Sequence, residues 1–127
     1  MRYFISAMLA IAAIIHLLPL SGVLGAERLG ALYGVQIADV ELALLMRHRA
    51  VLLGLVGILM LYGAVRPRSQ AVALTVGLVS VISFLVLALP PAAHNAQIAR
   101  VILADCVALA CLVAGGAAFL AARRRTG

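Results

Sequence analysis

Charge is scarce in this chain. Only 11% of its 127 residues are charged and 66% are hydrophobic, and just four residues are acidic. Soluble domains carry roughly a quarter charged residues and about half apolar ones. The scarcity of charge therefore excludes an ordinary soluble domain and indicates a membrane protein.

Lysine and tryptophan are absent, so all ten basic residues are arginine and the formal net charge is +6. The arginines stand singly or in short groups beside apolar runs, as the positive loops next to membrane spans do. A nucleic-acid-binding protein needs a basic face on a soluble domain, which this pattern does not offer. We therefore expect the lipid bilayer as a partner and no nucleic acid.

Cysteine is also rare. Cys106 and Cys111 are five positions apart, which on a helix turns their side chains about 140° from each other and leaves them too distant for a disulfide. This spacing excludes a disulfide framework. We interpret both as small buried apolar residues.

The most informative stretch runs from Asp39 to Pro67. Asp39 is a suitable N-cap, Glu41 suits the positive end of the helix dipole, and Pro67 cannot continue a helix. A helix of about 27 residues is roughly 40 Å long, more than a bilayer core requires. Gly54 and Gly57 on it give a surface that a neighbouring helix can approach closely.

The whole pattern predicts an all-α fold: one transmembrane domain, residues 1–127, forming a four-helix bundle. The expected helices cover residues 3–24, 39–65, 69–89 and 96–122, with Pro90-Pro91 ending the third. The first segment also resembles a signal peptide, but its removal would leave three spans and a polar start, so we expect it to be a span. Residues 25–38 are too short and glycine-broken to span, and we expect them to lie at the interface with Tyr33 as an anchor.

Four spans place both termini on one side of the membrane. Arg2, Arg66, Arg68 and the run Arg123 to Arg125 then share that side, while the four acids fall toward the other. The positive-inside rule makes the arginine-rich side cytoplasmic. We expect a multi-pass membrane protein with both termini in the cytoplasm.

Counting residues from the basic end of each span predicts a shared layer of polar side chains. At about 1.5 Å per residue, the expected heights are ~21 Å for His16, ~23 Å for Ser83, ~26 Å for Arg49, ~27 Å for His48 and Asp105, ~29 Å for Arg47 and ~35 Å for Arg100. An intramembrane charge costs roughly 2.5–3.5 kcal/mol at the centre, so Asp105 is expected to pair with Arg47 or Arg49. These arginines point about 200° apart, and the sequence leaves open which one faces inward. It also leaves open that the arginines reach the surface and that a single ion pair is purely structural.

This layer predicts an outward-facing pocket for the anionic or carbonyl head group of a lipid-like molecule or a quinone. Arg47 or Arg49 would receive the head group with His48 and His16, and Asp105 would orient the arginine. Arg100, Ser83 and Glu41 are secondary candidates. No nucleophile has an identifiable base beside it, so we expect no catalysis.

Other classes of function stay open. One is an accessory subunit of a larger membrane complex or a homo-oligomer, packing through Gly54/Gly57 and Gly115-Gly116. A proton-coupled exporter is disfavoured because the small multidrug exporters have an acid in their first helix, which this chain lacks. A bis-histidine haem on His16 and His48, or a metal on these two and Asp105, rests on few ligands. His16 is more simply a hydrogen-bonded residue between helices, and His94 a loop residue.

The runs LYGV from Leu32 and MRHRAVLLGLVGILMLYGAVRP from Met46 resemble small four-helix bacterial membrane proteins that are distantly similar to DoxX-like proteins. The resemblance implies the fold and the inner membrane, and the link of DoxX-like proteins to quinone-dependent respiration favours the head-group pocket. Some members are described as phosphopantetheine adenylyltransferases. That family is a soluble nucleotidyltransferase fold with an HxGH motif, and neither this motif nor a glycine-rich nucleotide loop occurs here, so we reject that activity.

Overall fold

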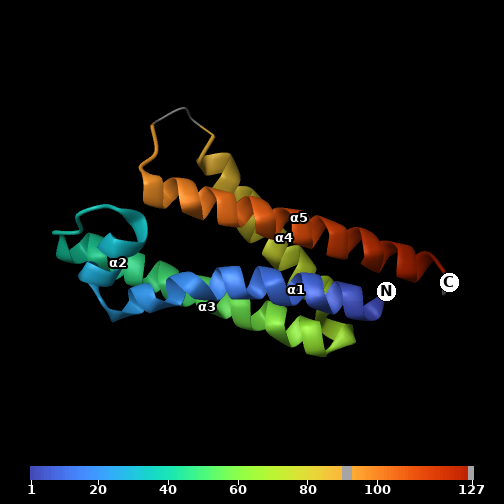
Figure 1. Cartoon of the computed structure of the whole chain (residues 1–127). Coiled ribbons are helices and arrows are strands. Elements are labelled where there is room, and N and C mark those ends of the chain that lie inside the picture. The colour runs from blue at the N-terminus through green and yellow to red at the C-terminus, as the bar shows by residue number, and fades with distance from the viewer. Residues whose placement is uncertain (90–92, 126–127) are drawn as a thin grey trace.

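The computed structural model describes residues 1–89 and 93–125, and these residues form helices without a strand. In chain order the elements are α1 (Arg2–Leu17), the 3₁₀ helix η1 (Leu18–Leu24), α2 (Ala26–Tyr33), α3 (Val40–Val65), the 3₁₀ turn η2 (Pro67–Ser69), α4 (Gln70–Leu87) and α5 (Ala96–Arg124). Figure 1 shows that the start of α1 and the end of α5 lie at the same end of the molecule, whereas α2 lies at the other.

Four helical segments are long and apolar enough to cross a membrane. They are Arg2–Leu24, Val40–Val65, Pro67–Leu87 and Ala96–Arg124, which confirms the all-α fold with four candidate spans. Large apolar side chains face outward along them, among them Leu45, Val65 and Leu87, which is 80% exposed. An outer surface of this kind suits contact with lipid chains, because water would leave so much apolar area unburied.

The helix ends follow from local chemistry. Asp39 caps α3, with its carboxylate accepting a hydrogen bond from the Leu42 amide at 2.8 Å, as the sequence predicts. Asn95 caps α5 in the same way through the Ile98 amide, also at 2.8 Å. The third predicted helix stops two residues early, at Leu87, and the fourth continues two residues further, to Arg124. The predicted stop at Pro90-Pro91 lies outside the described residues.

The first predicted helix, residues 3–24, changes from an α-helix to a 3₁₀ helix before its end. Its α-helical part stops at Leu17, and residues Leu18–Leu24 continue as a 3₁₀ helix that contains Pro19. A proline lacks the amide hydrogen that an α-helical bond to the fourth preceding residue needs, and its ring crowds that carbonyl. The tighter 3₁₀ winding accommodates the proline and still keeps the segment apolar and continuous.

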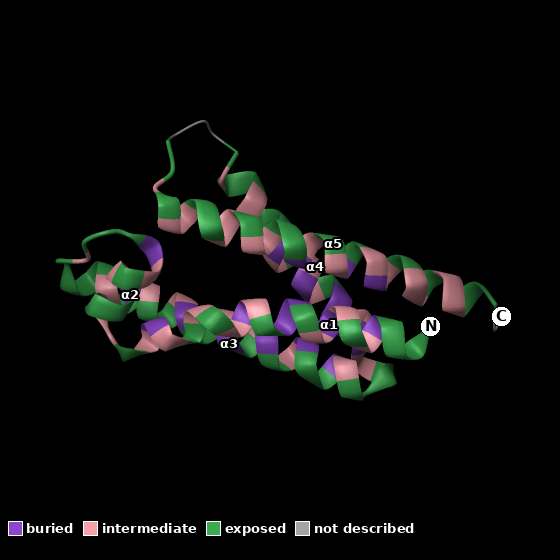
Figure 2. Ribbon diagram, in the orientation of Figure 1, coloured by how far each residue is buried: buried purple, intermediate pink, exposed green. Residues whose placement is uncertain are grey.

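The four long helices pack in a ring: α1 lies between α3 and α5, and α4 closes the bundle by packing against α3 and α5 behind it (Figure 1). The inward residues of α1, Ile5, Leu9, Ala12 and Ala13, are at most 2% exposed. Figure 2 shows the buried residues gathered where the helices meet, while the outer faces are exposed or intermediate. The surrounding core residues are Met60, Ala73, Leu74, Val81, Ala108 and Leu112.

Glycines bring neighbouring helices close together inside this bundle. A Cβ added at Gly54 would lie 2.6 Å from Leu20 Cδ1, and one at Gly115 would lie 3.2 Å from Met8 Cβ. The glycine surfaces at Gly54/Gly57 and Gly115, which the sequence suggested for contact with a partner complex, are therefore covered by α1 and η1 of the same chain. Gly116 differs, because nothing lies within 4 Å of the place of its Cβ.

Two sequence-based expectations about burial are wrong. Tyr33 is not an anchor at the surface: it is 4% exposed, because α2 folds back over the end of the bundle and turns Leu29 and Tyr33 inward. Neither cysteine is buried as expected: Cys106 is exposed and Cys111 is half-buried, because the inward face of α5 at this level is formed by Ala108 and Leu112.

Candidate functional site

The short helix α2 carries Tyr33 into the end of the bundle remote from the termini. Gly34 ends this helix in the left-handed conformation, with φ of +66°, and its amide donates to the Gly30 carbonyl at 2.8 Å. A Cβ at Gly34 would lie 2.6 Å from Gln97 Oε1, so this position requires glycine for both its backbone and its space. The Asn95 side-chain amide donates to the carbonyls of Tyr33 at 2.9 Å and Gly34 at 3.1 Å, which ties α2 to α5.

Arg49, on α3, is held by two aromatic rings. Its Nη1 donates to the Tyr33 hydroxyl at 2.8 Å, and its guanidinium carbon lies 5.4 Å from the centroid of the Tyr33 ring and 5.8 Å from that of Phe84. Cation–π contacts of this kind contribute about 0.5–2 kcal/mol. The other guanidinium N–H groups have no hydrogen-bond partner in the part of the chain that the structure describes. Arg49 is therefore fixed in place, and its other N–H groups can donate hydrogen bonds to a ligand.

A cavity of about 400 Å³ adjoins this guanidinium. We call it the Arg49 cavity; its lining consists of Tyr33, Val35, Met46, Arg49, Phe84, Leu87, Ala88, His94 and Ile98. His94 Nε2 lies 3.2 Å from the Ala88 carbonyl, which only accepts, so Nε2 donates and Nδ1 of the neutral ring is left as an acceptor. The cavity thus combines apolar walls with one cationic donor and one ring nitrogen.

A second cavity, of about 330 Å³, lies between η1, α2 and α5. We call it the Asp105 cavity; its lining consists of Ile15, Leu18, Pro19, Ala31, Leu32, Tyr33, Gln97, Arg100, Val101, Ala104 and Asp105. Tyr33 lines both cavities. Asp105 lies close enough to His16 and Arg49 to interact electrostatically with both.

The expected direct pair between Asp105 and Arg47 or Arg49 is not formed among residues 1–89 and 93–125, where no ion pair within 4.0 Å joins them. The pair is absent because of the way the helices pack. Helices α3 and α5 pack on α1 and not on each other, and the Tyr33 phenol takes the place next to Arg49. The inward-facing arginine that the sequence left open is Arg49.

His16 joins α1 to α4 inside the bundle, where it is 4% exposed. Its Nδ1 lies 3.0 Å from the Ala12 carbonyl and must donate, so its Nε2 accepts from the Ser80 hydroxyl at 3.2 Å. Both ring nitrogens are thus engaged, and an axial position on a haem would break one of these bonds. His48, the other histidine of that hypothesis, is exposed.

The remaining sequence candidates lie apart from Arg49 and Asp105, except Arg100, which lines the Asp105 cavity. Arg47 is exposed, and its Nε donates to the Val23 carbonyl at 2.9 Å. Ser83 is exposed and donates to the Ser80 carbonyl of its own helix at 2.9 Å. Glu41 is exposed in the first turn of α3.

Sequence reasoning did not place Tyr33, Phe84, His94 or Gln97 at a site. One signal for Tyr33 is present: Leu29 and Tyr33 are four residues apart between Gly25 and Gly34, the spacing of one buried helix face. The two rings around Arg49 come from segments far apart in the chain, and no local pattern joins them.

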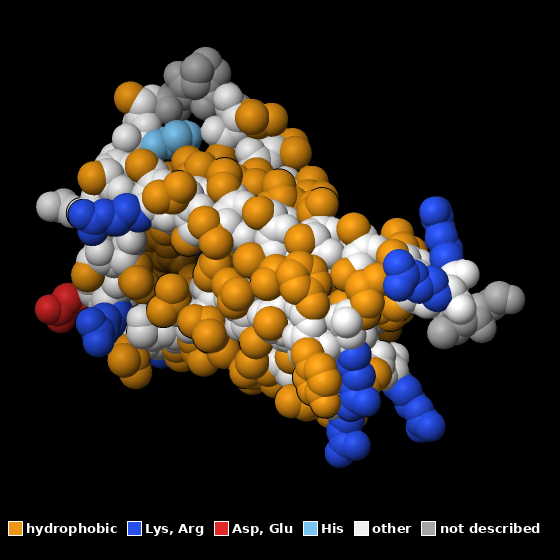
Figure 3. All heavy atoms as spheres, turned by 45° about the vertical axis from the view of Figure 1, so that its right-hand side comes forward, with side chains coloured by type: hydrophobic (Ala, Val, Ile, Leu, Met, Phe, Trp, Pro, Cys, Tyr) orange, Lys and Arg blue, Asp and Glu red, His pale blue; other side chains and the backbone are white. Residues whose placement is uncertain are grey.

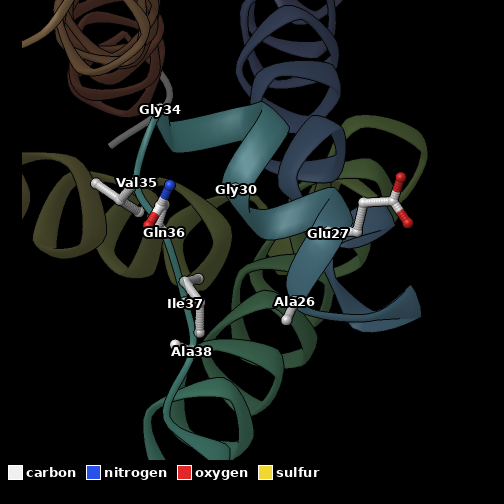
Figure 4. Close-up of a pocket in the computed structure, with 8 residues that line it drawn as sticks. All are labelled: Ala26, Glu27, Gly30, Gly34, Val35, Gln36, Ile37 and Ala38. Atoms are coloured by element: carbon white, nitrogen blue, oxygen red, sulfur yellow. The ribbon is translucent and has the colours of Figure 1, made fainter.

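A third, wider groove of about 570 Å³ lies between α2 and residues 34–38. Figure 4 shows that the Glu27 carboxylate points away from the segment that carries Gln36 and Ile37. The other lining residues are small or apolar, so polar groups do not converge here and we assign this groove no function.

The bond between His16 and Ser80 supports a stability prediction. Replacing Ser80 by alanine leaves a buried ring nitrogen without a donor, so we expect the free energy of unfolding to fall by about 1–2 kcal/mol. Ser83→Ala is the matched control, since its hydroxyl is exposed, and we expect a change within about 0.5 kcal/mol. Melting temperatures of the two variants in one detergent measure the difference; equal values would contradict the role of His16.

No cluster of three histidine, cysteine, aspartate or glutamate side chains that could hold a metal ion occurs among the residues that the structure describes. The candidate site thus consists of two cavities on either side of Tyr33, with Arg49 in one and Arg100 and Asp105 in the other. Comparison of the chain with family models, with curated proteins and with solved structures finds no match.

Proposed function

We propose that this is a multi-pass protein of the bacterial inner membrane, related to DoxX-like proteins, whose Arg49 cavity binds the anionic or carbonyl head group of a lipid-like molecule or a quinone. The four apolar helices support the membrane location. Arg2 begins α1, Arg66 and Arg68 lie in the connection between α3 and α4, and Arg124 ends α5; Figure 1 shows these element ends together at the end that holds the termini, and Figure 3 shows basic side chains there and some at the opposite end. By the positive-inside rule this end faces the cytoplasm, and the Arg49 cavity then opens toward the outer side.

The observation that carries this proposal is the state of the Arg49 guanidinium. It is half-buried, held by Tyr33 and Phe84, and without a carboxylate in ion-pair contact among the described residues. A cation in an apolar environment is costly unless it is paired or hydrogen-bonded. An acceptor supplied by a ligand would satisfy the remaining N–H groups.

The shape and lining of the cavity suit an amphiphile. At about 400 Å³ the cavity falls in the usual range of small-molecule sites, roughly 300–1,000 Å³. Met46, Leu87 and Ile98 provide an apolar wall for a ring or an alkyl chain, while Arg49 donates to a carbonyl or anionic oxygen. His94 adds a polar ring to the lining of the same cavity.

The test compares Arg49→Gln with Arg47→Gln. Arg47 is two residues away, exposed and outside both cavities, so it is a control for loss of a positive charge. A hydrogen bond to a charged group contributes about 1.5–3 kcal/mol. We expect Arg49→Gln to weaken binding of a short-chain ubiquinone or of palmitate roughly 10- to 150-fold, and Arg47→Gln to leave it unchanged.

Binding is measured by titration of the purified protein in nanodiscs, with circular dichroism and thermal melting checking that each variant folds alike. The proposal fails if neither probe binds the unmodified protein, or if both arginine variants bind as well as it does.

A further inference from the structure

The Asp105 cavity is lined by one acidic, one basic and one amide side chain: Arg100 is exposed, and Asp105 is within electrostatic reach of His16 and Arg49. Asp105, Arg100 and Gln97 line it together, and none makes a hydrogen bond or ion pair with another described residue. Asp105 is partly buried, at a level where the surrounding helices are apolar. A carboxylate in such a place gains much from a cationic partner.

Arg100 and Asp105 do not neutralise each other. They are five residues apart on α5, which separates their Cα atoms by about 7.5 Å along the axis and turns their side chains about 140° apart. The favourable spacings for a helical ion pair are three and four residues. Both side chains nevertheless line one cavity, so they present a negative and a positive group at separate places along it.

A ligand with only one charge would satisfy one of these groups and face the other. An anion on Arg100 is repelled by Asp105, and a cation on Asp105 is repelled by Arg100. We propose that the Asp105 cavity binds a zwitterion, with an ammonium group at Asp105 and a phosphate or carboxylate at Arg100. The Gln97 side-chain amide lies one turn before Arg100 and adds a donor for the anionic group.

The apolar part of the lining requires that the ligand also has an apolar portion. Ile15, Leu18 and Val101 face the same space, so the ligand presents carbon beside its charges. Two sources have this chemistry: a phosphoethanolamine lipid head group from the membrane and a free amino acid or phosphoethanolamine from the outer solution. This site is separate from the head-group site at Arg49 and does not depend on it.

The experiment uses the purified full chain in nanodiscs of phosphatidylglycerol, which is anionic without an ammonium group. In one arm, free phosphoethanolamine and leucine are titrated calorimetrically; in the other, phosphatidylethanolamine is mixed into the nanodiscs and retained lipid is counted by native mass spectrometry. We expect preferential binding in one arm, and that arm identifies the source. Absence of preference in both arms overturns the proposal.

Variants of Asp105 and Arg100 are compared by their preference for ligands of different charge. A merely structural role of these residues would leave that preference unchanged. Asp105→Asn removes the repulsion of anions, so we expect the preference for the zwitterion over a simple phosphate monoester or phosphatidylglycerol to fall at least about tenfold. Arg100→Gln is expected to shift the preference toward a simple amine. Glu27→Gln and Arg28→Gln, which change charges on α2 outside this cavity, are the controls and keep the original selectivity.

Two further variants keep the test decisive. Ala104→Leu fills the cavity without changing its charge and is expected to abolish zwitterion binding even if Asp105→Asn folds poorly. Arg49→Gln removes no side chain that lines this cavity, so the protein is expected to keep its preference for the zwitterion over singly charged probes, which separates this site from the proposed one. Unchanged selectivity in both Asp105→Asn and Arg100→Gln, or undiminished binding in Ala104→Leu, overturns the inference.

Discussion

Replacing Tyr33 by leucine is expected to weaken binding in both cavities at once. The ring lines each cavity, and its hydroxyl accepts the bond that fixes Arg49. Leucine removes that bond, worth about 1.5–3 kcal/mol, and the cation–π contact, worth about 0.5–2 kcal/mol. We expect at least a hundredfold loss for a quinone or fatty-acid probe and a smaller loss for a zwitterion.

Tyr33→Phe isolates the hydroxyl from the ring. The ring is kept, so we expect zwitterion binding to be unchanged and only the Arg49 cavity to lose affinity, by roughly 10- to 150-fold. Titrations of both variants with both kinds of probe measure these effects. Equal binding by Tyr33→Phe and the unmodified protein at the Arg49 cavity would show that the hydroxyl does not position the guanidinium.

Replacing Gly57 by leucine is expected to disrupt the bundle itself. A Cβ at this position would lie 2.8 Å from Leu17 Cγ and 3.2 Å from the Ala13 carbonyl oxygen, which belongs to the backbone and cannot turn aside. Overpacking a tight core costs about 1–3 kcal/mol, and here the added branches meet the most buried face of α1. We expect a loss of several kcal/mol in the free energy of unfolding and a large fall in folded yield.

Gly116→Leu is the matched control, because nothing lies within 4 Å of its Cβ position. It is expected to leave stability unchanged or slightly higher, since glycine costs up to about 1 kcal/mol in a helix. The fraction that remains monodisperse in detergent after heating compares the two. A Gly57→Leu variant as heat-resistant as Gly116→Leu would contradict the close approach of α1 and α3.

The sequence was sufficient for the long helices and their ends. Asp39 and Pro67 mark the bounds of α3 by local chemistry, and apolar runs of sufficient length define the other spans. The two arginines of α3 show what such reasoning cannot predict, namely which of them faces inward. Arg47 and Arg49 are equivalent by height and composition, and only the position of Tyr33, from a helix of eight residues, selects Arg49.

Counting residues along each helix also has a limit. It placed Ser83 nearest in height to His16, but the residue that bonds to His16 is Ser80, one turn closer to the basic end. Height alone says nothing about the direction of a side chain around its helix. Ser83 points outward and bonds to its own backbone, and the rotation of α4 that decides this comes from packing along its whole length.

Asn95 holds two helices with one side chain. Its side-chain oxygen caps α5 by accepting a hydrogen bond from the Ile98 amide. Its side-chain nitrogen donates to the Tyr33 and Gly34 carbonyls at the end of α2. The first turn of α5, which bears Gln97, is consequently fastened to the turn of α2 that bears Tyr33, so one asparagine sets the relative position of residues that line both cavities.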